Sequence, residues 1–181
     1  MKKVLEYCVN LWYSYTKDSK GDVGNMKDNK ITVFDVANYF RSKESMTHKK
    51  LQKLVYYAYA WYIALNNEDK TILNTKLFDG CHFEAWVHGP VCPLLYNEYS
   101  NNYGRVDKYK GRVNENITGE IKSFLDLIYK TFGKYTGDEL ETMTHKEMPW
   151  QNARDNLKPY EPSKKQILEE DMFVFYNSLV S

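Results

Sequence analysis

The segment 47–65 constrains the fold more than any other part of the chain. Thr47 is a residue type that favours the N-cap of a helix, and apolar side chains follow it at intervals of three and four residues. These apolar positions are Leu51, Leu54, Val55, Ala58, Trp61, Tyr62 and Leu65. Tyrosines at 56, 57 and 59 carry aromatic character to its other faces. The pattern predicts a central helix of about residues 47–66 that is covered on several sides.

The remaining segments predict a mainly α, compact single-domain fold around this helix. Expected helices are one opened by Thr32 and Asp35, one over 91–103, one from Ile117 or Thr118 to Gly133, a short one from Thr136, one with Pro149 in its first turn, and a last one after a Ser163–Gln166 capping box. Two short strands, 77–78 and 83–87, flank the turn pair Asp79-Gly80. They predict a small two-stranded β element at about 76–87, which Gly89-Pro90 ends. Residues 104–116 are expected to form a loop.

The N-terminal thirty residues differ in composition from the rest. Residues 3–15 have near-helical apolar spacing, and residues 16–30 are polar and contain glycine. We therefore expect an N-terminal helix plus flexible linker over 1–30, and a main domain over 31–181. The aromatic residues Trp12, Tyr13 and Tyr15 of this helix are candidates for an N-terminal specificity element.

Composition and charge narrow the classes of function. A net charge of +1 argues against a protein that coats nucleic acid. Sixteen tyrosines among 15% aromatic residues favour a binding protein, because tyrosine suits half-buried positions and interfaces. Three cysteines without a CxxC pair fit a reducing cytosol, and no apolar run has the length of a membrane span. We expect a cytoplasmic protein that does not associate with membranes.

Two kinds of chemical site are considered and not favoured. Cys81, His82, His88 and Cys92 are zinc-ligand types, but their spacing is poor, and adjacent residues of a strand point to opposite faces. Two buried thiols and two hydrogen-bonded imidazoles are the preferred interpretation. No nucleophile elbow, glycine-rich phosphate loop or HExxH motif is present. We therefore expect no metal, no cofactor, no catalytic residue and no enzymatic activity.

Several polar and aromatic side chains next to helix starts and turns could instead line a groove that binds a partner. The candidates are His48, Gln52, Tyr56, Trp86, His88, Tyr96, His145 and Trp150. Gln52 lies one helical turn after His48, so the two share a face. The alternative is that the histidines and Gln52 satisfy backbone groups at helix ends, as buried polar groups must. Trp86 and Trp150 are either core residues or exposed anchors.

Three blocks of sequence resemble the Panacea antitoxin domain. They are KLQKLVYYA at 50–58; FEAW at 83–86 with GPVCP at 89–93 and YNEY at 96–99; and LETMTHKEMPW at 140–150 with AR at 153–154. Cys92 departs from the aliphatic residue common at that position. The resemblance implies a helical domain that neutralises a protein toxin by direct binding. The alternative function is a phage or mobile-element accessory protein that binds a host defence or regulatory protein. Homo-oligomerisation stays open.

Overall fold

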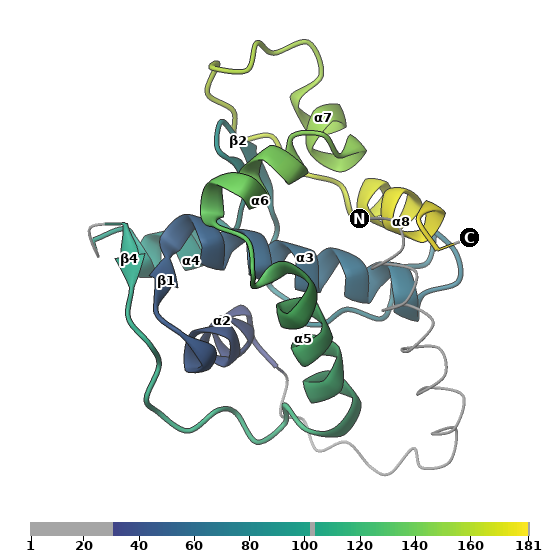
Figure 1. Cartoon of the computed structure of the whole chain (residues 1–181). Coiled ribbons are helices and arrows are strands. Elements are labelled where there is room, and N and C mark those ends of the chain that lie inside the picture. The colour runs from purple at the N-terminus through teal and green to yellow at the C-terminus, as the bar shows by residue number, and fades with distance from the viewer. Residues whose placement is uncertain (1–30, 102–103, 181) are drawn as a thin grey trace.

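The computed structural model describes residues 31–101 and 104–180 (Figure 1). Within these ranges the chain forms seven helices, α2 to α8, and two small two-stranded sheets. The predicted mainly α fold is confirmed. The expected N-terminal helix, its linker and the aromatic residues Trp12, Tyr13 and Tyr15 lie outside the described residues. No helix in the described ranges is long and apolar enough to span a bilayer.

Helix α3 (His48–Asn66) is the centre of the fold, as predicted. Thr47 caps it by accepting a hydrogen bond from the Lys50 backbone N–H, and every side chain from 51 to 61 is buried. Five helices pack against α3: α2 (Val33–Lys43), α4 (Pro93–Tyr99), α5 (Gly119–Phe132), α6 (Gly137–Thr144) and α8 (Glu169–Ser178). In Figure 1, α6 and α8 lie above α3, and α2 and α5 lie below it.

Most aromatic side chains of α3 pack inside this core. The Tyr57 and Phe132 rings stack with centroids 4.0 Å apart, and Tyr56 meets Phe83 edge-on at 5.3 Å. Further along, Trp61 packs against Tyr176 of α8 at 5.0 Å. Such ring pairs stabilise a core beyond the area that they bury. Much of the tyrosine excess is therefore structural.

Local capping signals place most helix ends correctly. Thr32 with Asp35 and Thr136 with Glu139 each form a complete capping box, which opens α2 and α6. Helix α5 has Thr118, one of the two predicted starts, as its N-cap and the predicted end, Gly133, as its C-cap. The short helices α4 (Pro93–Tyr99) and α7 (Met148–Arg154) each have a proline in the first turn.

The predicted Ser163–Gln166 capping box is wrong, because α8 begins only at Glu169. The segment before it pairs with β2 (Glu84–Trp86) instead. The Ala85 N–H donates to the Lys165 carbonyl at 2.8 Å, and the Ile167 N–H donates to the Phe83 carbonyl at 2.7 Å. A backbone held in this ladder cannot turn helical, so the helix starts where the pairing ends.

The strand pair lies further along the chain than predicted. β2 pairs antiparallel with β3 (Gly89–Val91), with Ala85 opposite Pro90. Gly89-Pro90 therefore belongs to the second strand and does not end the hairpin. Leu77 and Phe78, which were expected to form a strand, do not. The Ala85 N–H points away from β3, towards the Lys165 carbonyl. A proline opposite such a position removes no ladder hydrogen bond.

A second pair, β1 (Met46–Thr47) with β4 (Arg105–Val106), interrupts the loop expected at 104–116.

Candidate functional site

The three sequence blocks meet around the first half of α3. Gln52 joins this helix to the start of α4: its Oε1 accepts from the Cys92 N–H at 2.9 Å, and its Nε2 lies 3.4 Å from the Cys92 carbonyl oxygen. Only 2% of Gln52 is exposed. Its side chain therefore satisfies both backbone groups of the residue that precedes α4.

His48 lies beside Gln52, and the hydrogen bonds fix its proton. The Gln52 amide nitrogen is 3.0 Å from the His48 Nε2. Since the amide can only donate, Nε2 must accept, and the ring proton belongs on Nδ1. Burial is the main cause of the lowered pKa of His48, and the nearby Lys53 lowers it further. The imidazole is therefore a neutral structural link in this arrangement.

The Gly89-Pro90 turn lies against a buried lysine. Lys53 is 1% exposed, and its Nζ donates to the Pro90 carbonyl at 3.0 Å. Burial lowers the pKa of Lys53 to about 7. Gly89 has φ of +88°, and a Cβ there would come within 2.7 Å of the Lys53 Cε and 2.8 Å of the Thr144 Oγ1. Only glycine combines this backbone conformation with this close approach.

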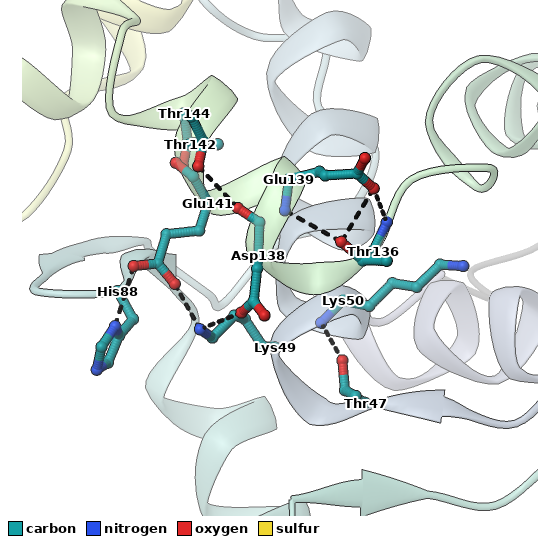
Figure 2. Close-up of polar contacts among 10 residues, drawn as sticks. All are labelled: Thr47, Lys49, Lys50, His88, Thr136, Asp138, Glu139, Glu141, Thr142 and Thr144. Atoms are coloured by element: carbon teal, nitrogen blue, oxygen red, sulfur yellow. Dashed lines mark hydrogen bonds and ion pairs between the residues drawn. The ribbon is translucent and has the colours of Figure 1, made fainter.

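A surface network ties the hairpin turn to α3 and α6 (Figure 2). The His88 Nδ1 is 3.0 Å from one Glu141 oxygen, and the Lys49 Nζ is 2.6 Å from the other. Lys49 also binds Asp138 at 2.7 Å. Although burial raises the pKa of Glu141, the hydrogen bonds from Lys49 and His88 lower it overall. The His88 side chain remains 70% exposed.

The two tryptophans occupy different environments. Trp150 is 7% exposed; its Nε1 donates to the Trp86 carbonyl at 3.0 Å, and its ring stacks on His145 at 4.0 Å. Burial is the main reason that the pKa of His145 is lowered. Trp86 is only half-buried; its Nε1 donates to Glu84 at 2.6 Å and its ring lies 4.7 Å from that of Tyr96. Trp150 is a core residue, and Trp86 lies at the boundary of the core.

Sequence reasoning missed the buried charged residues at the same junction. Glu147 is 8% exposed and accepts from the Tyr57 hydroxyl at 3.0 Å and the Tyr176 hydroxyl at 2.7 Å. Burial raises its pKa to about 7. Arg154, 2% exposed, donates to the carbonyls of Ala85, Lys158, Pro159 and Glu161. The signal that could have found them is their place inside the third block, beside Pro149 and Trp150.

The candidate residues thus divide into groups. The structure brings together the rings of His48, Tyr96 and Trp86, with Gln52 beneath them. His145 and Trp150 form a second group, joined to the first through the Trp86 carbonyl. Tyr56 is fully buried beside Phe83 and Tyr176, and His88 belongs to the surface network described above. Tyr96, which is 37% exposed, and His88 are the exposed members of the set.

The expectation of two buried thiols at Cys81 and Cys92 is wrong, because a disulfide joins these residues. Cys81 follows Asp79-Gly80, and Cys92 precedes α4. The bond between them therefore closes the loop that contains the β2–β3 hairpin. His82 is exposed and lies 3.3 Å from Glu84. Across residues 31–101 and 104–180, no group of three or more His, Cys, Asp or Glu side chains is arranged to hold a metal ion.

A comparison with protein families identifies the family to which the chain belongs. The family model described as antitoxin SocA-like, Panacea domain, matches residues 51–151. The chain belongs to this family. The match covers more than half of the 181 residues, from the second residue of the first sequence block to the residue after Trp150 in the third. Neither a curated protein nor a solved structure matches the chain.

Proposed function

We propose that this Panacea-domain protein is a non-enzymatic antitoxin that neutralises a protein toxin by direct binding. The observation that carries the proposal is the family match over residues 51–151. The geometry supports it in a second way. The buried His48 imidazole lies against Tyr96 and the Gln52 amide, and the half-buried His145 imidazole stacks on Trp150, so both rings have packing roles.

The toxin-contacting role belongs to the candidates with accessible side chains. Trp86, His88 and Tyr96 reach the surface at the hairpin and α4, beside the exposed Leu94. Tryptophan and tyrosine are over-represented among residues that dominate binding energy. The other candidates are less accessible: His48, Gln52, Tyr56 and Trp150 are buried, and His145 is half-buried. We assign them a structural role. Trp12, Tyr13 and Tyr15 remain candidates for an additional specificity element.

The test begins with the genes next to the one that encodes this protein. A neighbour whose expression arrests growth, and whose toxicity disappears when this protein is co-expressed, is the expected result. The purified pair should then bind directly. If no neighbour is toxic, the antitoxin proposal fails. Capture of a host defence protein in place of a neighbour-encoded toxin would instead support the accessory-protein alternative.

A matched pair of tyrosine variants tests the contact surface. Tyr96→Ala should weaken toxin binding at least about ten-fold, which corresponds to about 1.4 kcal/mol, with a melting temperature close to that of the wild type. Tyr160→Ala is the control, since Tyr160 is 70% exposed and lies in the loop before α8. Equal effects of the two substitutions would remove Tyr96 from the contact surface.

A further inference from the structure

A continuous row of rings and one guanidinium runs from the hairpin to the loop after β4. We call it the aromatic strip: Trp86, Tyr96, His48, Tyr99, Arg41 and Tyr109. Successive ring centroids from Trp86 to Tyr99 lie 4.7, 5.2 and 6.1 Å apart. The Arg41 guanidinium then lies 4.9 Å from the Tyr99 ring and 5.6 Å from the Tyr109 ring. The strip joins residues of five separate segments.

Hydrogen bonds hold the strip in place at the Arg41 end. The Arg41 side chain donates to the Asp107 carbonyl at 3.1 Å and to the Tyr99 hydroxyl at 2.9 Å. The Tyr109 N–H donates to the Arg41 carbonyl at 3.0 Å. The loop after β4 is therefore fixed against α2 and α4, and its charged residues lie at a defined end of the strip. In Figure 1, α2, α4 and β4 gather around the end of α3 where this helix begins.

The strip offers both apolar and positively charged contacts. Tyr96 and the neighbouring Leu94 are 37% and 48% exposed. The buried His48 ring lies between the rings of Tyr96 and the buried Tyr99. Four exposed cations flank Tyr109 in the sequence: Arg105, Lys108, Lys110 and Arg112. Among the described residues, neither Lys108 nor Lys110 makes an ion pair. This positive end stands out in a chain whose net charge is only +1.

Resting on the proposed antitoxin function, we propose that the aromatic strip binds an acidic, aromatic-containing segment of the toxin. Aromatic or aliphatic side chains of that segment pack on Trp86 and Tyr96, and its carboxylates face Lys108 and Lys110. Complementary charge of this kind fixes the orientation of a partner and speeds its association. Single-stranded nucleic acid would also combine stacking with positive charge. The exposed carboxylates Glu98 and Asp107 beside the strip disfavour such a polyanion and suit a protein segment of mixed character.

Selection from a displayed library of random short peptides against the full chain tests the proposal without a toxin. The enriched peptides should combine acidic and aromatic residues, and their affinity should fall as salt is raised. The double variant Lys108→Glu with Lys110→Glu should weaken these peptides at least about ten-fold. Tyr96→Ala should weaken them as well. Circular dichroism and thermal melts would confirm that each variant is folded.

The control is the single charge reversal Lys70→Glu, compared with the single reversal Lys108→Glu, which makes the same change in charge. Lys70 is exposed and makes no ion pair among the described residues. It follows the far end of α3, whereas Lys108 lies in the loop after β4. Lys70→Glu should leave peptide affinity within about two-fold of the wild type, since only charges within about a Debye length matter strongly. Lys108→Glu should weaken the peptides at least about three-fold.

Three outcomes would overturn the proposal. One is that no binder is enriched or that the enriched peptides lack acidic residues. Another is that Lys70→Glu weakens binding as much as Lys108→Glu does. The third is that an oligothymidine probe binds more tightly than the peptides and loses affinity in the Lys108→Glu, Lys110→Glu variant, which would make the strip a nucleic-acid site. Because the selection needs no toxin, its failure is distinguishable from the absence of a toxic neighbour.

Discussion

Replacing Gly89 with alanine should destabilise the domain through two separable effects. The first is the backbone conformation, since φ of +88° is one that residues with a Cβ rarely adopt. The second is steric, because the new methyl would lie 2.7 Å from the Lys53 Cε and 2.8 Å from the Thr144 Oγ1. Both neighbours are buried, so neither can move aside into solvent.

Gly80 supplies a matched control for the conformational effect alone. It has φ of +73°, and a Cβ there meets nothing within 4 Å. Left-handed backbone costs a residue with a Cβ about 1–2 kcal/mol, which is the expected loss for Gly80→Ala. Overpacking a well-filled interior adds about 1–3 kcal/mol. Gly89→Ala should therefore lower the free energy of unfolding by about 2–5 kcal/mol, and the difference between the two variants isolates the contact with Lys53 and Thr144.

Urea denaturation followed by circular dichroism measures both variants on the same scale. The slope of the free energy with urea should be unchanged, so that shifts of the midpoint report stability. The close packing of the turn on Lys53 should make Gly89→Ala clearly more destabilising than Gly80→Ala. A difference of no more than about 0.5 kcal/mol in free energy of unfolding, which is the usual range for surface substitutions, would show that this packing does not stabilise the domain.

Further predictions concern buried charge, the tryptophans and the N-terminal segment. Because the folded-state pKa of Glu147 is raised from 4.5 to about 7, stability should fall as pH rises from about 4.5 to 7, by at most about 3 kcal/mol; Glu147→Gln should flatten this part of a denaturation series. Because the folded-state pKa of Lys53 is lowered from 10.5 to about 7, stability should rise between about pH 7 and 10.5, and Lys53→Met should remove the rise. An unchanged dependence of stability on pH in the Glu147 or Lys53 variant would contradict the shifted pKa of that residue. Trp150→Ala should cost about 3–5 kcal/mol in chemical denaturation and Trp86→Ala less, and the reverse order would contradict their placement. Deletion of residues 1–29 should leave the melting temperature unchanged and abolish toxin binding if the N-terminal segment confers specificity, whereas retained binding would exclude that role.

The sequence predicted those parts of the fold that depend on neighbouring residues. Thr47, Thr32 with Asp35, and Thr136 with Glu139 cap their helices through hydrogen bonds that span three residues, and such patterns are visible in a short window. The start of α8 was misplaced because the residues before it pair with Glu84, far away in the chain. A local capping signal at Ser163 does not reveal that competing partner.

The same distinction explains the outcome at the candidate site. The Gln52 and His48 pairing followed from helical spacing, whereas the hydrogen bonds from Gln52 to Cys92 depend on how α4 packs against α3. Charged residues are usually exposed, so Lys53 and Glu147 did not stand out. Their burial depends on distant groups, namely the missing side chain of Gly89 and the hydroxyls of Tyr57 and Tyr176.

The attachment of Gln52 to the Cys92 backbone has a practical consequence for engineering. Helix α4 is held through the main-chain groups of Cys92, the residue that precedes it, so this anchor does not depend on the identity of the outward-facing side chains. Positions 94, 96, 97 and 98 are all exposed. A library randomised at these four positions should therefore preserve the fold while presenting many different surfaces, which makes the domain a small helical framework for selecting new binders.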